Sequence, residues 1–261
     1  MTTRNARGRS GGTRFSDVRR HREVGSTNQL AAELARLGAP EGVVVVADHQ
    51  TAGRGRRGRS WDTRPGSSLL VSVLTRPAPG SGPTTLVTVA CGMAAADACL
   101  AAAGFLPGLK WPNDLVVGGH KVGGILAEVV AGGANPPAVV LGLGLNVTGP
   151  VPVPGAVAAD EVTERPVDRD ELLAAFLDRL ELHYARLSNA AGRHRVLDEF
   201  RGRCVTLGRD VRILRPGAHV LEGRATDVTP AGSLVVSADD RTEVVSAGDV
   251  DHVRPGDHRF R

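Results

Sequence analysis

Glycine occupies alternate positions in residues 138–147 (AVVLGLGLNV), and this pattern constrains the fold more than any other feature of the chain. The apolar residues predict a buried β-strand, in which successive side chains point to opposite faces. Three leucines then share one face, whereas the other face carries only Gly142, Gly144 and Asn146. Because glycine weakens a strand, a face without side chains predicts that something packs flat against it. A bulge or a closely packed helix is one explanation, and a bound ligand is the other.

A second strand with internal glycine is predicted over residues 121–130 (KVGGILAEVV). Alternation groups Lys121, Gly123 and Ile125 on one face. Lys121 is one of only two lysines among the 32 Lys and Arg residues, and the other is Lys110. Arginine supplies the positive charge elsewhere, so these lysines favour a site where a planar guanidinium cannot replace a compact ammonium. Chance clustering is the alternative, but the two strands together favour a ligand slot beside Lys121.

The first of the two lysines opens the segment Lys110-Trp111-Pro112-Asn113-Asp114. Pro112 fixes its own φ and biases the preceding residue towards extended geometry, so the segment is predicted to be rigid. Asn113 and Asp114 give it a polar tip, although an Asx turn is the commoner role of such a pair.

Residues 53–61 (GRGRRGRSW), here called the glycine–arginine loop, contain the pattern G-x-G-x-x-G after a predicted strand. A dinucleotide-binding fold would need a helix to begin there and an acidic residue about 20 positions later, and neither is present. The G-K-[ST] ending of a Walker loop is also missing. Glycine lets a backbone approach a ligand closely, and arginine binds phosphate or carboxylate with two hydrogen bonds. We therefore predict a small anionic ligand, with a solvated basic turn or a nucleic-acid contact as alternatives.

Charge and composition disfavour two classes of protein, general polyanion binders and membrane proteins. The net charge is +4, but residues 1–24 carry +5 and residues 50–64 carry +4, so the rest of the chain is acidic. Aromatic residues make up only 3% of the chain, which leaves few platforms for stacking bases. A general polyanion binder is therefore disfavoured. No uninterrupted apolar run approaches the roughly 18 residues of a membrane span, and no signal peptide is visible. We expect a soluble, cytoplasmic protein without a membrane partner.

The order of segments predicts an α/β domain followed by a small β module. The α/β part has a helix from Ser26 to about Gly38, the Ala-rich helix 84–103 and helices near 168–188 and 192–202. Its predicted strands are residues 42–48, 69–75, 109–111, 115–117, 121–130 and 138–147. Short segments with turn residues between them follow Cys204. The expected boundaries are a disordered tail at 1–18, an α/β domain at 19–203, a β module at 204–255 and a tail at 256–261.

The three cysteines and eight histidines suggest no metal site or disulfide framework. Three is an odd number in a long chain, which is typical of a reducing compartment. We expect Cys91, Cys99 and Cys204 to be small buried residues. The histidines show no spacing typical of metal ligands.

Four motifs together resemble those of the biotin–protein ligase family. They are GRGRRGRSW at 53–61, KWPNDL at 110–115, KVGGIL at 121–126 and GLGLNV at 142–147, preceded by Ser26-Thr27-Asn28. The resemblance covers roughly residues 20–250. It implies a mixed α/β (α+β) catalytic domain, with helices flanking a mixed sheet as in class II aminoacyl-tRNA synthetases, and a small C-terminal SH3-like β-barrel.

The family resemblance also implies a reaction and its participants. Biotin and ATP, with Mg²⁺ carried by the ATP and no metal ligands from the protein, give biotinyl-5′-AMP. The biotinyl group then passes to one lysine of the biotin carboxyl carrier domain of an acetyl-CoA or propionyl-CoA carboxylase. The chain resembles the monofunctional type without a DNA-binding domain, so no specific nucleic-acid partner is expected. A lipoate–protein ligase with the same adenylation chemistry is the nearest alternative, and a non-enzymatic nucleic-acid-binding protein is a more distant one.

The resemblance assigns three sets of site residues. The catalytic set is Lys121, Arg56 and Asp114, where Asp114 either receives the incoming amine or forms only an Asx turn. The biotin-binding set is Ser26, Thr27, Asn28, Gln50, Arg54, Gly55, Arg56, Lys121, Gly123, Gly124, Gly142 and Gly144. The nucleotide-binding set is Arg57, Arg59, Trp61, Lys110, Asn113 and Asn146. Ser60 stands where the family commonly has a lysine or another long residue, so the nucleotide side is expected to be less charged here.

Overall fold

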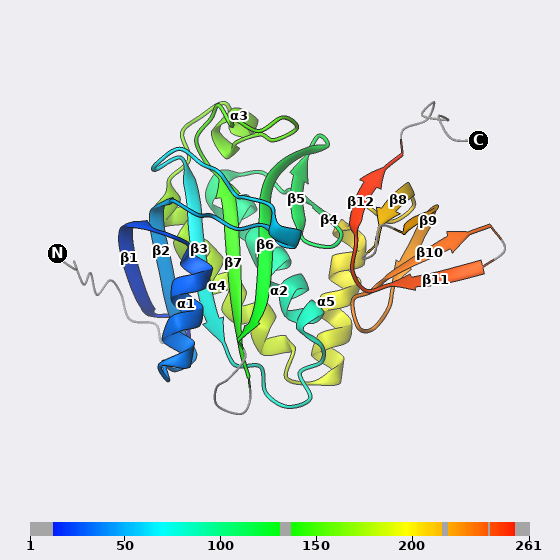
Figure 1. The fold of residues 1–261 in the computed structure, drawn as a ribbon, viewed down its shortest axis with the longest axis horizontal. Coiled ribbons are helices and arrows are strands. Elements are labelled where there is room, and N and C mark those ends of the chain that lie inside the picture. The colour runs from blue at the N-terminus through cyan, green and yellow to red at the C-terminus, as the bar shows by residue number, and fades with distance from the viewer. Residues whose placement is uncertain (1–12, 131–136, 216–218, 240, 254–261) are drawn as a thin grey trace.

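The computed structural model of the chain describes residues 13–130, 137–215, 219–239 and 241–253. A seven-stranded mixed sheet forms its larger part (Figure 1). The strands lie in the spatial order β1 (Asp17–Val24), β2 (Val43–Gln50), β3 (Ser68–Thr75), β7 (Ala138–Asn146), β6 (His120–Val130), β5 (Asp114–Val117) and β4 (Gly108–Lys110). Only β1 and β2 pair in parallel, and the other neighbours are antiparallel.

Helices cover both faces of this sheet. In Figure 1, α1 (Thr27–Arg36) lies in front of the sheet, and α2 (Thr84–Ala98) and α4 (Arg169–Arg186) lie behind it. The remaining helices are α5 (Ala190–Arg203) and the short elements η1 (Arg56–Gly58), η2 (Cys99–Ala103) and α3 (Ala159–Thr163). The predicted mixed sheet with flanking helices is thereby confirmed.

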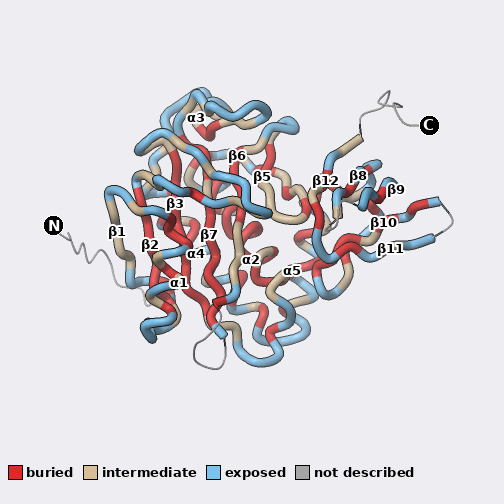
Figure 2. The backbone as a smooth tube through the Cα atoms, viewed as in Figure 1, coloured by how far each residue is buried: buried red, intermediate tan, exposed pale blue. Residues whose placement is uncertain are grey.

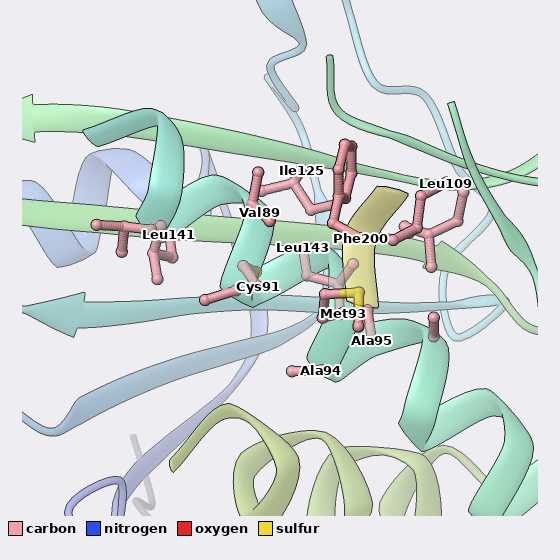
Figure 3. Close-up of a cluster of buried hydrophobic side chains, with 14 of the residues drawn as sticks. Val89, Cys91, Met93, Ala94, Ala95, Leu109, Ile125, Leu141, Leu143 and Phe200 are labelled. Carbon is pink, nitrogen blue, oxygen red and sulfur yellow. The ribbon is translucent and has the colours of Figure 1, made fainter. Parts of the chain in front are cut away.

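Alternation along the strands divides the buried residues between two hydrophobic clusters. On β2, Val44 and Val46 belong to the larger cluster, under α2 and α4, whereas Val43 and Val45 belong to the smaller cluster, under α1. The leucines of β7 face the larger cluster (Figure 3). The glycine face of β7 is therefore on the same side of the sheet as α1.

The predicted Ala-rich helix is α2 with its continuation η2, and it ends at Gly104, which has a φ of +79°. Residues 84–103 are long and apolar enough to cross a membrane by length and composition. However, 72% of its 18-residue apolar window is buried inside the protein, and apolar residues all round a helix are typical of a buried core helix. Cys91 and Cys99 lie on it, and both are buried and free, as is Cys204.

A five-stranded antiparallel sheet forms the C-terminal module, as predicted. Its spatial order is β11 (Arg241–Val245), β10 (Leu234–Ala238), β9 (Val220–Val228), β8 (Asp210–Leu214) and β12 (Asp249–His252). The buried Trp111 joins this module to the larger domain, because its indole Nε1 donates a 3.0 Å hydrogen bond to the Gly232 carbonyl. Buried residues of both sheets belong to one hydrophobic cluster, and Figure 2 shows buried segments in each sheet.

The predicted tail at 1–18 ends earlier than expected, because Phe15 is buried and β1 begins at Asp17. The sequence of β1, DVRRHREV, has no apolar run, since this edge strand is largely exposed, and so the strand was not predicted. The short helix α3 was also missed. Residues 1–12 and 254–261, which hold most of the two predicted tails, lie outside the described residues.

Replacing Phe15 with alanine is expected to lower the free energy of unfolding by about 3–5 kcal/mol, the usual range for a buried phenylalanine. Its ring is 1% exposed and meets the ring of Tyr184 edge to face, with centroids 5.9 Å apart. Denaturant unfolding measures the change, and Arg22→Ala on exposed β1 is the control. Equal unfolding midpoints for the two variants would show that Phe15 is not a core residue.

Candidate functional site

A cavity of about 270 Å³ lies on the α1 side of the large sheet. Segments that are far apart in the chain meet there, among them the start of α1, the glycine–arginine loop, residues 110–114, the strands β6 and β7, and β12. Most of the predicted site residues line it, namely Ser26, Thr27, Asn28, Gln50, Arg54, Gly55, Arg56, Arg59, Trp61, Lys110, Asn113, Asp114, Lys121, Gly124, Gly142 and Gly144.

Uncharged polar side chains occupy the end of the cavity at the start of α1. Gln50 Oε1 accepts hydrogen bonds from the Thr27 amide at 2.8 Å and from the Thr27 hydroxyl at 3.0 Å. The Ser72 hydroxyl lies 2.8 Å from the Thr27 hydroxyl and 2.6 Å from Asn28 Oδ1. Ser26 is at the predicted N-cap position but makes no side-chain capping bond. This end therefore presents hydrogen-bonding groups without a net charge.

Glu128, which sequence analysis did not select, connects this polar end to the glycine–arginine loop. Its carboxylate accepts a 2.8 Å hydrogen bond from Asn28 Nδ2 and forms a 3.1 Å ion pair with Arg54. Asn28 Nδ2 also donates to the Leu126 carbonyl at 3.1 Å, so its amide is fixed at both ends. Gly124, Leu126 and Glu128 alternate on β6, and this alternation is the sequence signal that would have placed Glu128 beside the cavity.

The glycine–arginine loop folds back on itself beside the cavity. The Trp61 amide donates to the Gly53 carbonyl at 2.9 Å, and the Gly55 amide donates to the Arg59 carbonyl at 2.7 Å. A Cβ on Gly53 would lie 2.2 Å from the Trp61 carbonyl oxygen, so only glycine fits that close approach. Close packing of the loop backbone at Trp61 therefore explains why residue 53 is a glycine.

Arg56 of the loop contacts the turn between β4 and β5. Its Nη1 donates to Asn113 Oδ1 at 3.1 Å, and Asn113 Nδ2 donates to the Ile125 carbonyl at 2.7 Å. Burial lowers the pKa of the Arg56 guanidinium, while Asp249 and Asp114 oppose that shift. An arginine remains protonated at neutral pH nevertheless, so a partly desolvated positive charge stands in the cavity.

Lys121 forms a compact cluster with two other predicted residues. Its Nζ lies 2.6 Å from Asp114 Oδ1 and 5.3 Å from the centre of the Trp61 ring. The Asp114 carboxylate thus contacts an ammonium in the cavity. Lys121 and Arg56 bring two cations to one side of the cavity.

The glycine faces are covered by protein side chains in this structure. A Cβ on Gly142 would lie 2.2 Å from Asn28 Oδ1, and one on Gly144 would lie 2.5 Å from Trp61 Cε2. The absence of side chains therefore makes room for Asn28 and Trp61, both of which line the cavity. The glycine pattern predicted a ligand slot directly on the strand backbone. In the structure, the side chains of Asn28 and Trp61 also form part of its wall.

The predicted grouping of Lys121 with Gly123 is wrong. A Cβ on Gly123 would point at Leu145 and Leu115, towards the hydrophobic core, whereas one on Gly124 would lie 3.1 Å from Lys121 Nζ. The register between β5 and β6 shifts near Val116, which pairs with Lys121 while Leu115 pairs with Gly123. This irregularity breaks strict alternation. Gly124 consequently takes the position that alternation assigned to Gly123.

Two more predicted residues do not line the cavity. The Asn146 amide nitrogen donates to the Lys121 and Val157 carbonyls, at 3.4 and 3.3 Å, so it supports the backbone beneath Lys121. Arg57 reaches the C-terminal sheet instead, where its Nη1 donates to the Leu214 carbonyl at 3.0 Å. Among the described residues, no group of three or more His, Cys, Asp or Glu side chains is placed to hold a metal ion.

The fold and the cavity define an α/β small-molecule site with a neutral polar end and a cationic end. Residues 22–146 match the biotin/lipoate A/B protein ligase family, and residues 206–253 match the biotin protein ligase C-terminal domain. The biotin--[acetyl-CoA-carboxylase] ligase of Mycobacterium tuberculosis is 38% identical over 242 residues, which cover 89% of this chain and 87% of that protein. The chain therefore belongs to the biotin protein ligases of this family.

A further relative agrees with this assignment, and a solved structure agrees with the fold. The biotin--[acetyl-CoA-carboxylase] ligase of Paracoccus denitrificans is 32% identical over 237 residues, covering 86% of this chain and 96% of that protein. The solved biotin protein ligase from Aquifex aeolicus, in complex with biotin and ATP, has a TM-score of 0.78. The match covers 92% of this chain and 100% of that chain at 24% identity, and we take it as evidence of the fold.

Proposed function

We propose that this chain is an ATP-dependent biotin–protein ligase that makes biotinyl-5′-AMP and transfers the biotinyl group to a carrier lysine. The observation that supports this most is the cavity itself. It combines neutral hydrogen-bonding groups at the start of α1, which suit a ureido ring, with Arg56 and Lys121, which suit a carboxylate and a phosphate.

In the first step, a biotin carboxylate oxygen attacks the α-phosphorus of ATP, and the bond from that phosphorus to the pyrophosphate oxygen breaks. Two anions must approach each other, so fixed cations that meet the developing charge lower the barrier. Lys121 and Arg56 are the proposed catalytic cations. Lys121 must exchange its 2.6 Å contact with Asp114 for a contact with the ligand.

Mg²⁺ bound to the ATP phosphates would supply positive charge beside the departing pyrophosphate. The cavity gives the ion no free set of protein ligands among the described residues. Of its three carboxylates, Asp114 pairs with Lys121, Asp249 pairs with Arg57 and Arg59, and the third is Asp251, whose charge acts on His252. This arrangement fits an ion carried by the nucleotide.

The binding assignments remain proposals that the geometry supports to different degrees. Ser26, Thr27, Asn28, Gln50, Gly142 and Gly144 adjoin the neutral end, while Arg54, Gly55 and Gly124 lie along the slot towards Lys121. On the nucleotide side, Arg59, Trp61, Lys110 and Asn113 line the cavity. Gly123, Arg57 and Asn146 are better described as supporting residues, because they contact the core, the C-terminal sheet and the backbone of Lys121.

The second step needs the carrier lysine as a neutral amine. A lysine with a pKa of about 10.4 is deprotonated in only about one molecule in a few thousand at neutral pH. Once ligand has drawn Lys121 away, the Asp114 carboxylate is positioned to accept the proton of the incoming ammonium. The amine nitrogen then attacks the biotinyl carbonyl carbon, AMP leaves with the electrons of the mixed-anhydride bond, and the second proton of the nitrogen passes to the departing AMP phosphate.

The lipoate–protein ligase alternative shares this chemistry but differs in its acid. Lipoate has a long apolar chain and no ureido group, so it has little use for the hydrogen-bonding set around Gln50. The nucleic-acid alternative requires free loop arginines, yet Arg54, Arg56 and Arg59 contact Glu128, Asn113 and Asp249. Biotin is therefore the proposed acid.

The proposed partner is the biotin carboxyl carrier domain of an acetyl-CoA or propionyl-CoA carboxylase, in the cytoplasm. Incubation of this chain with biotin, ATP and that domain is expected to add the mass of one biotinyl group to the carrier. A carrier whose target lysine is replaced by arginine should gain nothing. Modification of both carriers, or of neither, would reject the proposed transfer step.

A further inference from the structure

Glu128 on β6 has a separate partner for each of its two carboxylate oxygens. Its Oε2 accepts the 2.8 Å hydrogen bond from Asn28 Nδ2, and its Oε1 pairs with Arg54 at 3.1 Å. Asn28 is only 4% exposed, and its Nδ2 also donates to the Leu126 carbonyl at 3.1 Å. Both hydrogens of the Asn28 amide are thus taken by acceptors on β6, and these partners establish which end of the amide is the nitrogen.

The oxygen end of the Asn28 amide determines where the Ser72 proton lies. Asn28 Oδ1 is 2.6 Å from the Ser72 hydroxyl, and a carbonyl oxygen can only accept a hydrogen bond. Ser72 is fully buried and its hydroxyl carries a single proton, so that proton points to Asn28. No proton of Ser72 is left for the Thr27 hydroxyl oxygen, which lies 2.8 Å from Ser72 Oγ.

The Thr27 hydroxyl is in consequence a hydrogen-bond acceptor for any ligand in the cavity that it lines. Its single proton has two acceptors within the protein, Gln50 Oε1 at 3.0 Å and Ser72 Oγ at 2.8 Å. If Thr27 donated that proton to a ligand, both of these short contacts would join two oxygens without a proton between them. The ligand group that suits Thr27 Oγ1 is therefore a donor such as an N–H, and not a carbonyl.

We propose that Glu128 is a positioning residue that sets the hydrogen-bond polarity of the neutral end of the cavity. Through Asn28 and Ser72 it keeps the Thr27 hydroxyl as an acceptor for a ligand N–H. A carboxylate suits this role because it cannot donate, so the reversed amide of Asn28 would meet no donor there. The inference deepens the proposed function and rests on it for the identity of the acid. Biotin carries two ureido N–H groups, whereas lipoate carries none.

Nuclear magnetic resonance of the ligand-free full chain tests the contact between Glu128 and Asn28 without any substrate. The side-chain amide signal of Asn28 is identified by its absence from Asn28→Ala. We expect its hydrogens to exchange with water about tenfold faster in Glu128→Ala, because one of two hydrogen bonds is lost. Glu128→Gln should restore most of the protection, since its carbonyl oxygen can accept the same bond. Glu33→Ala, which removes an exposed carboxylate of α1, is the matched control. Unchanged exchange in Glu128→Ala would overturn the proposal.

Selectivity between ligands tests the effect on the Thr27 hydroxyl. The probes are biotin and its two cyclic carbamate analogues, in each of which a ring oxygen replaces one ureido N–H. By calorimetric titration, we expect the wild type to bind one of these analogues about a hundredfold more weakly than biotin, because an oxygen then faces the Thr27 acceptor. In Glu128→Ala the ratio should fall to about tenfold or less, since the Asn28 amide can reverse and release the Ser72 proton to Thr27.

A double-mutant cycle tests whether Glu128 acts through Ser72. Ser72→Ala should lower the selectivity ratio to the same value as Glu128→Ala, and the double variant should lower it no further, because the two residues belong to one path. A ratio that stays at the wild-type value in Glu128→Ala, with biotin and the analogue weakened alike, would show a merely structural role and overturn the proposal. A wild type that binds neither biotin nor the analogues would reject the proposed function, and amide exchange would still decide whether Glu128 orients Asn28.

Discussion

Replacing Lys121 with alanine is expected to lower the rate of adenylate formation by about 10³-fold, the loss typical when a preorganised group that meets transition-state charge is removed. Lys121 is the ammonium that the cavity presents beside Asp114 and the Trp61 ring. Lys121→Arg should also be slow, because a planar guanidinium cannot occupy the space of an ammonium held against a carboxylate and an indole. Pyrophosphate release under biotin and ATP saturation measures both variants.

Folding should survive the loss of Lys121. Its side chain is 35% exposed and that of Asp114 is 25% exposed, so their ion pair is partly solvated and contributes little to the free energy of unfolding. Thermal unfolding of Lys121→Ala therefore serves as the control and should resemble that of the wild type. Wild-type turnover in a folded Lys121→Ala protein would remove this residue from the mechanism.

Replacing Gly142 with valine is expected to reduce biotin affinity by about a hundredfold or more, with a stability loss of about 1–3 kcal/mol from overpacking. Its Cβ would lie 2.2 Å from Asn28 Oδ1. Asn28 cannot simply turn aside, because Ser72, Leu126 and Glu128 hold both ends of its amide. The neutral end of the cavity must therefore be rearranged.

Calorimetric titration with biotin measures the effect of Gly142→Val, and Gly202→Ala is its matched control. Gly202 lies on α5 with no atom within 4 Å of an added Cβ, so that change should leave both affinity and folding intact. Biotin binding of wild-type strength in Gly142→Val would show that the glycine face is unrelated to the ligand.

Much of the fold could be predicted because its central elements have strong local patterns. The buried strands β2, β3 and β7 are nearly continuous apolar runs, and the Ala-rich core helix ends at a glycine. β1 could not be found in this way, because an exposed edge strand needs no apolar face. The sequence could not show that Gly124, and not Gly123, lies beside Lys121, because this arrangement arises from a register shift between β5 and β6.

Candidate site residues could be predicted from sequence where the residue type is unusual for its segment. Lys121 is a rare lysine and Gly142 is a glycine inside a strand, so each is visible from composition or pattern. Glu128 and Asp249 are ordinary acidic residues on strands, and their importance lies in Arg54, Arg57 and Arg59, which the fold brings to them. Contacts between distant segments depend on tertiary structure, and local sequence does not encode them.

The central claim is that the cavity activates biotin as an adenylate. Pyrophosphate release with ATP and Mg²⁺ should therefore be compared in the presence of biotin, of lipoate and of no acid, with the product identified by mass. We expect release that depends on biotin and a product with the mass of biotinyl-5′-AMP. Release that depends on lipoate, or no release with either acid, would contradict the assignment.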